Sequence, residues 1–74
     1  MPSARGYADA TIETKTAVYV FEFKYAKSPA AAIRQIRERG YANAYRNDKR
    51  PVTLIGIKFD PKVRNITIPK IEAL

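Results

Sequence analysis

The chain has 74 residues, of which 46% are hydrophobic and 28% are charged, and this composition is typical of one small folded domain rather than of a disordered chain. Cysteine and histidine are both absent, which excludes disulfides, thiolate or imidazole metal sites, and Ser-His or Cys-His nucleophiles, so any bound metal must be a hard cation on oxygen ligands. The 14 Lys and Arg against 7 Asp and Glu give a net charge of +7, which fits a polyanionic partner such as nucleic acid but equally fits a surface charged only for solubility.

Two strands are predicted at the beginning of the chain. Residues 7–14, YADATIET, alternate between two faces with a period of two. After a polar break at Lys15 and Thr16, residues 17–25, AVYVFEFKY, are rich in β-branched and aromatic residues and predict a second strand that forms a hairpin with the first. One face of the second strand carries Tyr19, Phe21, Phe23 and Tyr25, and the other carries Val18, Val20, Glu22 and Lys24.

A helix is predicted within residues 27–47, KSPAAAIRQIRERGYANAYRN, because the segment is rich in alanine and begins with good helix-start residues. Ser28 suits the N-cap and Pro29 suits the first helical position. Gly40 weakens the helix, so it indicates either a close contact with the sheet or a break. The residues that recur at three- and four-residue spacing and define the predicted buried face are Ile33, Ile36, Gly40 and Ala44.

The last part of the chain predicts two further strands. Turn residues at 47–51, NDKRP, precede residues 52–60, VTLIGIKFD, a largely apolar segment that indicates a central strand buried on both faces. Residues 63–71, VRNITIPKI, predict one more strand, and Pro69 places it at an edge of the sheet because proline has no N–H to donate. The predicted order of elements is β-β-α-β-β.

One helix can cover only one side of such a sheet. The other side must be covered by residues outside this sequence or by a second copy of the chain, so we predict a homodimer or a higher oligomer. No apolar run approaches the roughly 20 residues required to cross a bilayer, and the N-terminus lacks the apolar stretch of a signal peptide. We therefore expect a cytoplasmic protein without a membrane partner.

Two charged residues at the end of the second strand are candidates for chemistry. Glu22 and Lys24 share one face, which could simply mark a strand that leaves its core and turns polar. If the hairpin loop has two residues, however, Thr14 pairs with Ala17 and Asp9 lies opposite Glu22. Two carboxylates so placed repel each other unless a proton or a cation lies between them, and Mg²⁺ is commonly held by one or two carboxylates. Lys24 could then position an attacking water or stabilise negative charge on phosphorus.

This arrangement resembles the PD-(D/E)XK nuclease superfamily, whose pattern is an Asp on one strand and Glu-x-Lys on the next. Asp9 matches the first acid, and Glu22-Phe23-Lys24 matches the second motif. RGYAD, VYVFEFK, QIRERGYANAY and LIGIKFD are similar to the C-terminal nuclease-like domain behind AAA-type ATPase domains of bacterial and archaeal proteins, over about residues 5 to 68. The resemblance implies a minimal restriction-endonuclease-like core, an α/β (α+β) fold with a mixed sheet and one main helix.

The resemblance also implies roles for a helix Gln and a following Tyr, which correspond to Gln35 and Tyr41. Gln35 would orient substrate or water, unless it is only a solvent-exposed helix residue, and Tyr41 would contact nucleic acid or pack in the core. The family core usually begins with a helix before the first strand, so residues 1–74 are expected to be a single truncated or minimal domain. Basic residues that could contact phosphates, or form only a solvated surface, are Arg5, Arg34, Arg37, Arg39, Arg46, Lys49 and Arg50.

We therefore predict a nuclease dependent on Mg²⁺ or Mn²⁺, with DNA favoured over RNA as its substrate. Asp9 and Glu22 hold the metal, and Lys24 and Gln35 complete the catalytic cluster. Two alternatives stay open: a non-catalytic module that binds nucleic acid, and an oligomerisation domain that keeps the nuclease fold. No GxxxxGK[ST] sequence is present, so any ATP dependence would belong to another polypeptide.

Overall fold

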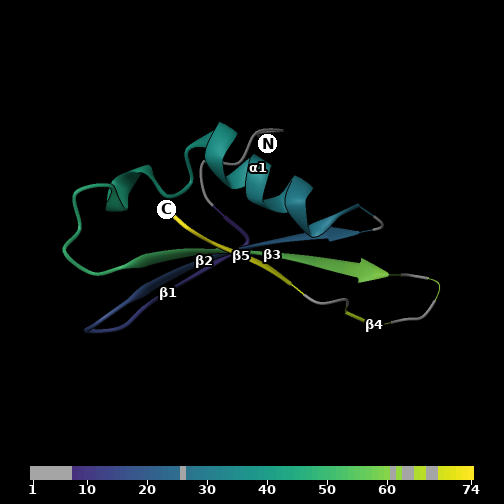
Figure 1. Ribbon diagram of the computed structural model, residues 1–74, viewed down its shortest axis with the longest axis horizontal. Coiled ribbons are helices and arrows are strands. Elements are labelled where there is room, and N and C mark those ends of the chain that lie inside the picture. Colours follow the sequence, from purple (N-terminus) through teal and green to yellow (C-terminus); the bar gives the residue numbers. More distant parts are fainter. Residues whose placement is uncertain (1–7, 26, 61, 63–64, 67–68) are drawn as a thin grey trace.

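The computed structural model describes residues 8–25, 27–60, 62, 65–66 and 69–74. It has one layer of sheet and one layer of helix, with α1 lying over the strands (Figure 1). This confirms the predicted α+β architecture of a mixed sheet with one main helix. The elements are β1 (Ala10–Glu13), β2 (Val18–Tyr25), α1 (Pro29–Arg39), the short 3-10 helix η1 (Asn43–Tyr45), β3 (Val52–Asp60), β4 (Asn65–Ile66) and β5 (Lys70–Ala73).

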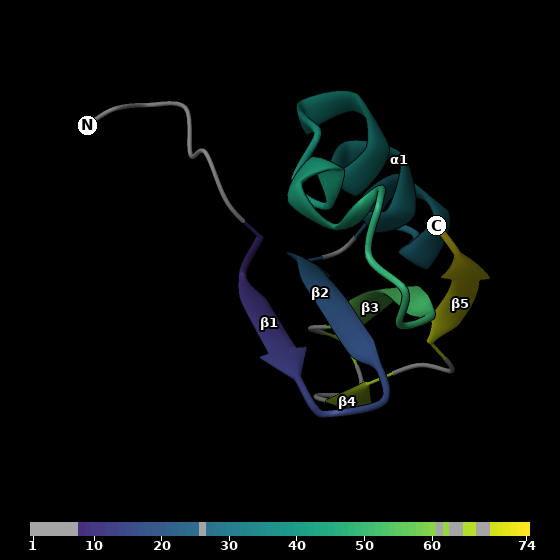
Figure 2. The ribbon, with the colours of Figure 1, turned by 90° about the vertical axis from the view of Figure 1, so that its left-hand side faces the viewer.

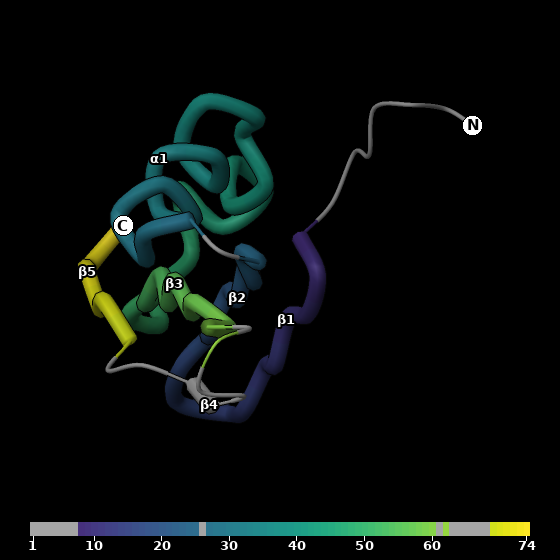
Figure 3. The backbone as a smooth tube through the Cα atoms, turned by 90° about the vertical axis from the view of Figure 1, so that its right-hand side faces the viewer, coloured from purple at the N-terminus to yellow at the C-terminus, as the bar shows by residue number. Residues whose placement is uncertain are grey.

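The five strands form one sheet in the order β1-β2-β3-β4, and β5 also pairs with β3. β1 is antiparallel to β2, β2 is parallel to β3, and both β4 and β5 are antiparallel to β3. The parallel β2–β3 pair needs a crossover connection, and α1 provides it. Figure 3 shows α1 above β2 and β3, with β1 and β5 on opposite flanks of the sheet.

The register of the β1–β2 hairpin is the predicted one. Ala10 pairs with Phe21, and at the loop Thr14 N donates to Ala17 O at 2.8 Å. The Thr14 hydroxyl also accepts from the N–H of Ala17 at 2.9 Å and from that of Thr16 at 3.2 Å, which stabilises a two-residue loop. β1 begins at Ala10 rather than at the predicted Tyr7, which lies outside the described residues.

Helix α1 begins as predicted, and it ends at Gly40, where the sequence left a break open as one of two possibilities. Ser28 is the N-cap, with its Oγ accepting from Ala31 N at 3.2 Å, and Pro29 is the first helical residue. Gly40 ends the helix in the left-handed conformation, with φ of 68°, which favours glycine. Since the helix stops there, the prediction that Ala44 lies on its buried face is wrong: Ala44 is exposed, and Tyr41 is buried instead.

The core lies between α1 and the sheet. Gly56 of β3 allows a close approach, because a Cβ atom at this position would lie 2.3 Å from the carbonyl oxygen of Pro29. The first turn of α1 therefore rests directly on β3, level with Glu22, which pairs with Gly56 in the parallel register. The buried apolar residues are Ala8, Val18, Val20, Ala32, Ile33, Ile36, Tyr41, Ala42, Val52 and Leu54.

The opposite side of the sheet carries no described helix, as Figure 2 shows. The prediction that residues 52–60 are buried on both faces is therefore wrong: Val52 and Leu54 are buried under α1, while Ile55 and Ile57 on the other side are only half-buried. We call this side the uncovered face. Its large apolar residues, placed there by strand alternation and register, are Ile12, Tyr19, Phe21, Phe23, Tyr25, Ile55, Ile57, Phe59 and Ile71.

The predicted last strand, residues 63–71, is two short strands in the structure. β4 and β5 both lie beside β3, and among the described residues neither pairs with any other strand. Pro69 precedes β5 on this side of β3, so its predicted edge position is confirmed. In the part of the chain that the structure describes, no helix is long and apolar enough to span a membrane.

Candidate active site

The candidate site lies at the carboxyl end of β2, on the side that faces α1. Val18 and Val20 are fully buried there, and two residues farther along the same face Glu22 is only 1% exposed. Burying a carboxylate without hydrogen bonds would cost several kcal/mol, on the order of the desolvation penalty of one ion. Glu22 is instead well partnered: Oε2 accepts from Gln35 Nε2 at 2.7 Å, and Oε1 accepts from the backbone N of Asp9 at 3.3 Å.

Asp9 lies opposite Glu22, just before β1 begins. Its carboxylate oxygen Oδ2 accepts from the backbone N of Phe23 at 2.8 Å. In a continued antiparallel ladder a backbone carbonyl would take this N–H, so the Asp9 side chain replaces the strand where β1 has not yet started. The two carboxylates thus reach the backbone of each other's strand. Unlike Glu22, Asp9 is exposed, so the pair has one buried and one accessible acid.

Gln35 connects the Glu22 carboxylate to the Lys24 ammonium. It projects from α1, and its amide oxygen accepts from Lys24 Nζ while its amide nitrogen donates to Glu22. Only this orientation of the amide satisfies both neighbours, because an ammonium can only donate and a carboxylate can only accept. Gln35 Nε2 also donates to the hydroxyl oxygen of Tyr41 at 3.3 Å. The side chain therefore fixes Glu22 and Lys24 relative to each other.

The structure brings five of the predicted site residues together and holds Arg37 elsewhere. Arg37 projects from the other side of α1, since it is two residues and thus about 200° from Gln35. Its guanidinium donates to Glu72 Oε1 at 2.9 Å and to Ala73 O at 3.0 Å. This ion pair lowers the pKa of Glu72. The residues that meet at the site are Asp9, Glu22, Lys24, Gln35 and Tyr41.

Of the other arginines, Arg34 and Arg39 are exposed on α1, and Arg39 follows Gln35 by one turn on the same side. Arg5 lies outside the described residues. Tyr41 is buried, with its ring in the core and its hydroxyl toward Gln35. Sequence reasoning missed the two backbone N–H donors of the site, those of Asp9 and Phe23. These two N–H groups bind carboxylates because β1 begins only at Ala10, and the alternation of residues 7–14 does not show where the strand begins.

A second polar cluster lies away from the site and holds the η1–β3 connection against the hairpin. We call its members, Glu13, Tyr45, Asp48 and Arg50, the far cluster. The Arg50 guanidinium donates to Asp48 at 2.7 and 2.9 Å, to Glu13 at 3.1 Å and to Thr14 O at 2.9 Å. The hydrogen bonds between Arg50 and Asp48 lower the pKa of Asp48 to about 2. The Tyr45 hydroxyl donates to Glu13 Oε2 at 2.9 Å, and this hydrogen bond raises the pKa of Tyr45. Arg50 was predicted to contact phosphate, but its guanidinium is already paired with Asp48 and Glu13 of its own chain.

The donor atoms of the site fit a hard divalent cation. Asp9 and Glu22 offer carboxylate oxygens, and an ionised carboxylate presents about four lone-pair sites to donors and cations. Within the described part of the chain no three acidic side chains gather closely enough to hold a metal by themselves. Mg²⁺ suits such a sparse site, because it usually keeps several waters and takes only one or two protein carboxylates together with substrate phosphates.

Comparison with known proteins agrees with this arrangement. Residues 2–68 match a family model described as the PD-(D/E)XK nuclease superfamily. The chain is also 34% identical over 74 residues to an uncharacterized protein in the vnfD 5' region of Azotobacter chroococcum mcd 1. This similarity covers 97% of the chain but only 14% of that relative. No solved structure matches the chain. The match over residues 2–68 shows that the chain belongs to the PD-(D/E)XK nuclease superfamily.

Proposed function

We propose that this domain is a metal-dependent nuclease that hydrolyses phosphodiester bonds in DNA or RNA. One observation carries the proposal: the buried Glu22 carboxylate, the Gln35 amide and the Lys24 ammonium form one hydrogen-bonded chain beside Asp9. A strand that merely turned polar at its end would leave these groups in solvent. Instead, a carboxylate is buried to 1% exposure and linked through an amide to an ammonium, which is typical of a site built for chemistry.

In this proposal Asp9 and Glu22 hold Mg²⁺ or Mn²⁺, which when bound polarises a phosphoryl oxygen and lowers the pKa of a bound water. Glu22 is the rigid ligand, because Gln35 and the Asp9 backbone fix both of its oxygens. Asp9 is the accessible ligand. Lys24 provides a positive charge that stabilises the negative charge developing on the phosphate. Gln35 is a positioning residue, since it acts by holding Glu22 and Lys24 in place.

The cleavage test uses purified protein with plasmid DNA, single-stranded DNA and RNA in Mg²⁺ or Mn²⁺. Glu22→Gln and Lys24→Met each remove one charge from the site, and each should lower the cleavage rate by about 10²-fold or more. Glu38→Gln is the matched control, because Glu38 is an exposed acid of α1 outside the site. Equal cleavage by the two site variants and the control would refute the proposal. The predicted association with an AAA-type ATPase domain stays a prediction.

We also propose that the uncovered face pairs with the same face of a second copy. Phe23, Tyr25 and Phe59 are 48%, 67% and 37% exposed, and Ile12 and Ile71 are at least half-exposed. The three aromatic side chains alone leave about 300 Å² of surface in water, taking roughly 200 Å² for a whole side chain. One partner of a standard interface contributes about 800 Å² in total, so these three side chains alone would supply more than a third of it.

A second copy suits this face because no described strand residue that lies on it is charged, although the chain carries a net charge of +7. Face-to-face contact would therefore place no like charges together at its centre. Two sheets packed in this way lie about 10 Å apart, with their side chains interdigitated. In such a dimer both Glu22 sites, which lie on the helix side of each sheet, would stay outside the interface.

A further inference from the structure

The arginines that the structure describes differ in whether their side chains are already paired. Arg37, Arg46 and Arg50 each donate to a side chain of their own chain. Arg34 and Arg39, both on α1, make no hydrogen bond or ion pair with any residue that the structure describes. A guanidinium carries five N–H donors and stays charged. Two arginines of α1 are therefore available to an anionic ligand.

Helical geometry separates these two arginines. Each residue of an α-helix is rotated by about 100° from the residue before it. Arg34 lies two residues before the buried Ile36, so it points about 200° away from the core and into solvent. Arg39 lies seven residues after the fully buried Ala32, which places the two within about 20° of each other around the helix axis. Arg39 is also one turn after Gln35 on the same side of the helix.

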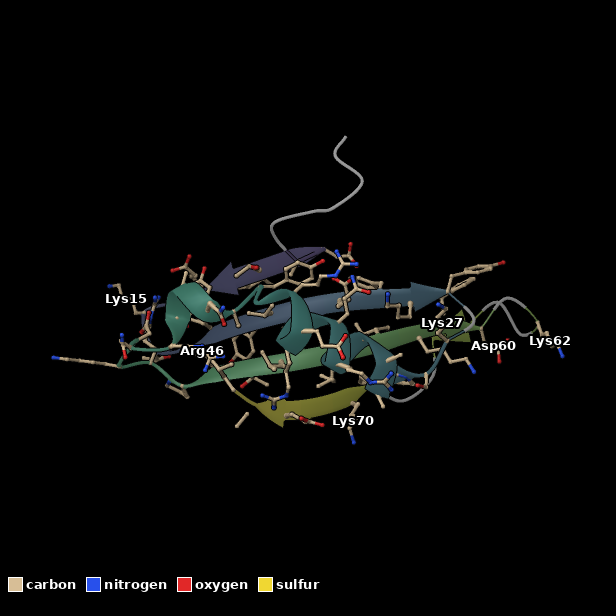
Figure 4. All side chains as sticks on the ribbon, turned by 90° about the horizontal axis from the view of Figure 1, so that it is seen from above. Lys15, Lys27, Arg46, Asp60, Lys62 and Lys70 are labelled. Atoms are coloured by element: carbon tan, nitrogen blue, oxygen red, sulfur yellow. The ribbon has the colours of Figure 1, made fainter. Side chains whose placement is uncertain are left out.

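The two flanks of α1 face different strands. Figure 4, which looks down on the helix, shows β1 and β2 along one flank and β5 along the other. Gln35 reaches Glu22 of β2 on the first flank, whereas Arg37 reaches Glu72 of β5 on the second. Around the helix axis Arg39 is about 40° from Gln35 and about 160° from Arg37. Arg39 therefore lies on the flank that carries the candidate site.

The acids on this flank enter the charge balance as well. Asp9 and Glu22 carry two negative charges, which the divalent cation proposed for this site would offset. Glu13, the acid of β1, is held by the far cluster. With both proposed metal ligands offset in this way, the flank retains the positive charges of Lys24 and Arg39. Two positive charges beside the site favour a polyanion over a neutral ligand.

We propose that Arg39 binds a backbone phosphate of the nucleic-acid substrate, beside the phosphodiester held at Asp9 and Glu22. The inference rests on the proposed nuclease function and adds to it a contact that holds the strand. A guanidinium can pair with two phosphate oxygens at once, which suits it to this role. Such a contact positions the strand without reading its sequence.

The position of Arg39 also gives the direction of the strand. Helix α1 returns from the carboxyl end of β2 to the amino end of β3, so Arg39 lies toward the hairpin loop from Gln35. Four residues of helix rise about 6 Å, and a nucleic-acid strand carries one phosphate about every 3.4 Å along its axis. The bound phosphate is therefore about two nucleotides from the scissile one. The strand runs along the flank between α1 and β1.

An arginine at the end of a helix also has an ordinary structural role. A positive charge in the last turn stabilises the helix dipole, and Arg37 and Arg39 share that turn. This role depends on charge alone and involves no nucleic acid. By itself it predicts a lower melting temperature for Arg39→Gln with unchanged binding of DNA and RNA.

The test measures binding separately from cleavage. Fluorescence anisotropy of labelled single-stranded DNA, duplex DNA and RNA is recorded in EDTA and in Ca²⁺ over a range of salt concentrations. Arg34→Gln is the matched control, because it removes the same charge from the solvent side of the same helix. Arg39→Gln should weaken binding about tenfold and reduce the slope of log K against log salt by about one. Arg34→Gln should keep the wild-type affinity and slope.

Arg39→Lys keeps the charge but not the planar fork of donors, so it should keep the wild-type slope and bind more tightly than Arg39→Gln. Melting followed by circular dichroism shows that each variant is folded. Equal affinity and slope in Arg39→Gln and Arg34→Gln would overturn the inference, as would a wild type that binds none of the three probes. A wild type that binds through Arg39 but cleaves nothing in Mg²⁺ or Mn²⁺ would support the contact and refute the nuclease.

Discussion

Asp9 and Glu22 each place a carboxylate oxygen on the backbone of the other's strand: Glu22 Oε1 accepts from Asp9 N at 3.3 Å, and Asp9 Oδ2 accepts from Phe23 N, next to Glu22, at 2.8 Å. This exchange occurs where β1 starts, so the acids replace the next rung of the hairpin ladder. The hairpin register and the acidic pair are therefore one structural feature. A change that shifts the start of β1 would separate the two carboxylates.

Replacing Gln35 with Leu should disable the site while keeping the fold. The variant leaves Glu22 and Lys24 without their common partner, which should destabilise the protein by about 1–3 kcal/mol. Affinity for Mn²⁺ should fall by about 10- to 100-fold, because orienting residues around metal ligands typically contribute that much. Calorimetric titration and urea unfolding measure the two effects. Unchanged Mn²⁺ affinity would show that Gln35 does not position Glu22.

Replacing Gly56 with Ala should move α1 away from β3. The added Cβ atom meets Pro29 O at 2.3 Å and Ala32 Cβ at 3.0 Å, so the first turn of the helix must shift. Overpacking of this kind should cost about 1–3 kcal/mol of unfolding free energy. Because the shift also moves Gln35 relative to Glu22, cleavage should fall with stability. Urea unfolding of wild type and variant provides the comparison, and equal midpoints would show that the helix does not rest on Gly56.

The far cluster should make stability depend on pH in the acid range. The hydrogen bonds from Arg50 lower the pKa of Asp48 to about 2 from its ordinary 3.8. Between these values the unfolded chain binds more protons than the folded one, so the stabilisation is complete above about pH 4 and disappears as the pH falls through about 2. Glu72, whose pKa Arg37 lowers, changes stability in the same direction.

Asp48→Asn isolates this contribution. The unfolding free energies of the wild type and the variant are measured from pH 5 to pH 2 and should converge as the pH falls. Protonation of Asp48 in the wild type removes the same negative charge that the substitution removes in the variant. Glu38→Gln, which replaces an exposed acid outside the far cluster, serves as the control. Parallel curves for wild type and Asp48→Asn would contradict the assignment.

The uncovered face should make the protein a dimer in solution at micromolar concentrations. Phe23→Lys places a charge at the centre of the face, where burial of an unpaired ammonium is unfavourable, and should give a monomer. Sedimentation equilibrium measures both masses. Lys15→Glu, a charge change in the hairpin loop, should leave the dimer intact. A monomeric wild type would refute the proposed pairing of two copies.

Local signals predicted the hairpin and the start of the helix. A polar two-residue loop at Lys15 and Thr16 fixes the β1–β2 register, and Ser28 with Pro29 begins α1, because both features depend on neighbours in sequence. The end of the helix was left open, since Gly40 is compatible with a close contact or with a break. The left-handed conformation of Gly40 settles it, and Ala44 is consequently exposed.

The parts that sequence reasoning did not predict depend on the β2–β3 register. That register is set by how α1 packs on the sheet, with Gly56 beneath Pro29, and no local pattern encodes it. It also places Lys58 beside Lys24 in the sheet. Gln35 was chosen from the resemblance to a family, and the structure supplies its physical reason, the bridge from Lys24 to Glu22.

The most direct test of the proposed function is calorimetric titration of Mn²⁺ into the wild type and Glu22→Gln under identical conditions. Glutamine keeps the size of the side chain but removes the charge that a hard cation requires. We expect one bound Mn²⁺ per wild-type chain and an affinity at least tenfold lower in Glu22→Gln, with both proteins folded. Equal affinity in the two proteins, or a wild type that binds no Mn²⁺, would contradict the assignment of Asp9 and Glu22 as a metal site.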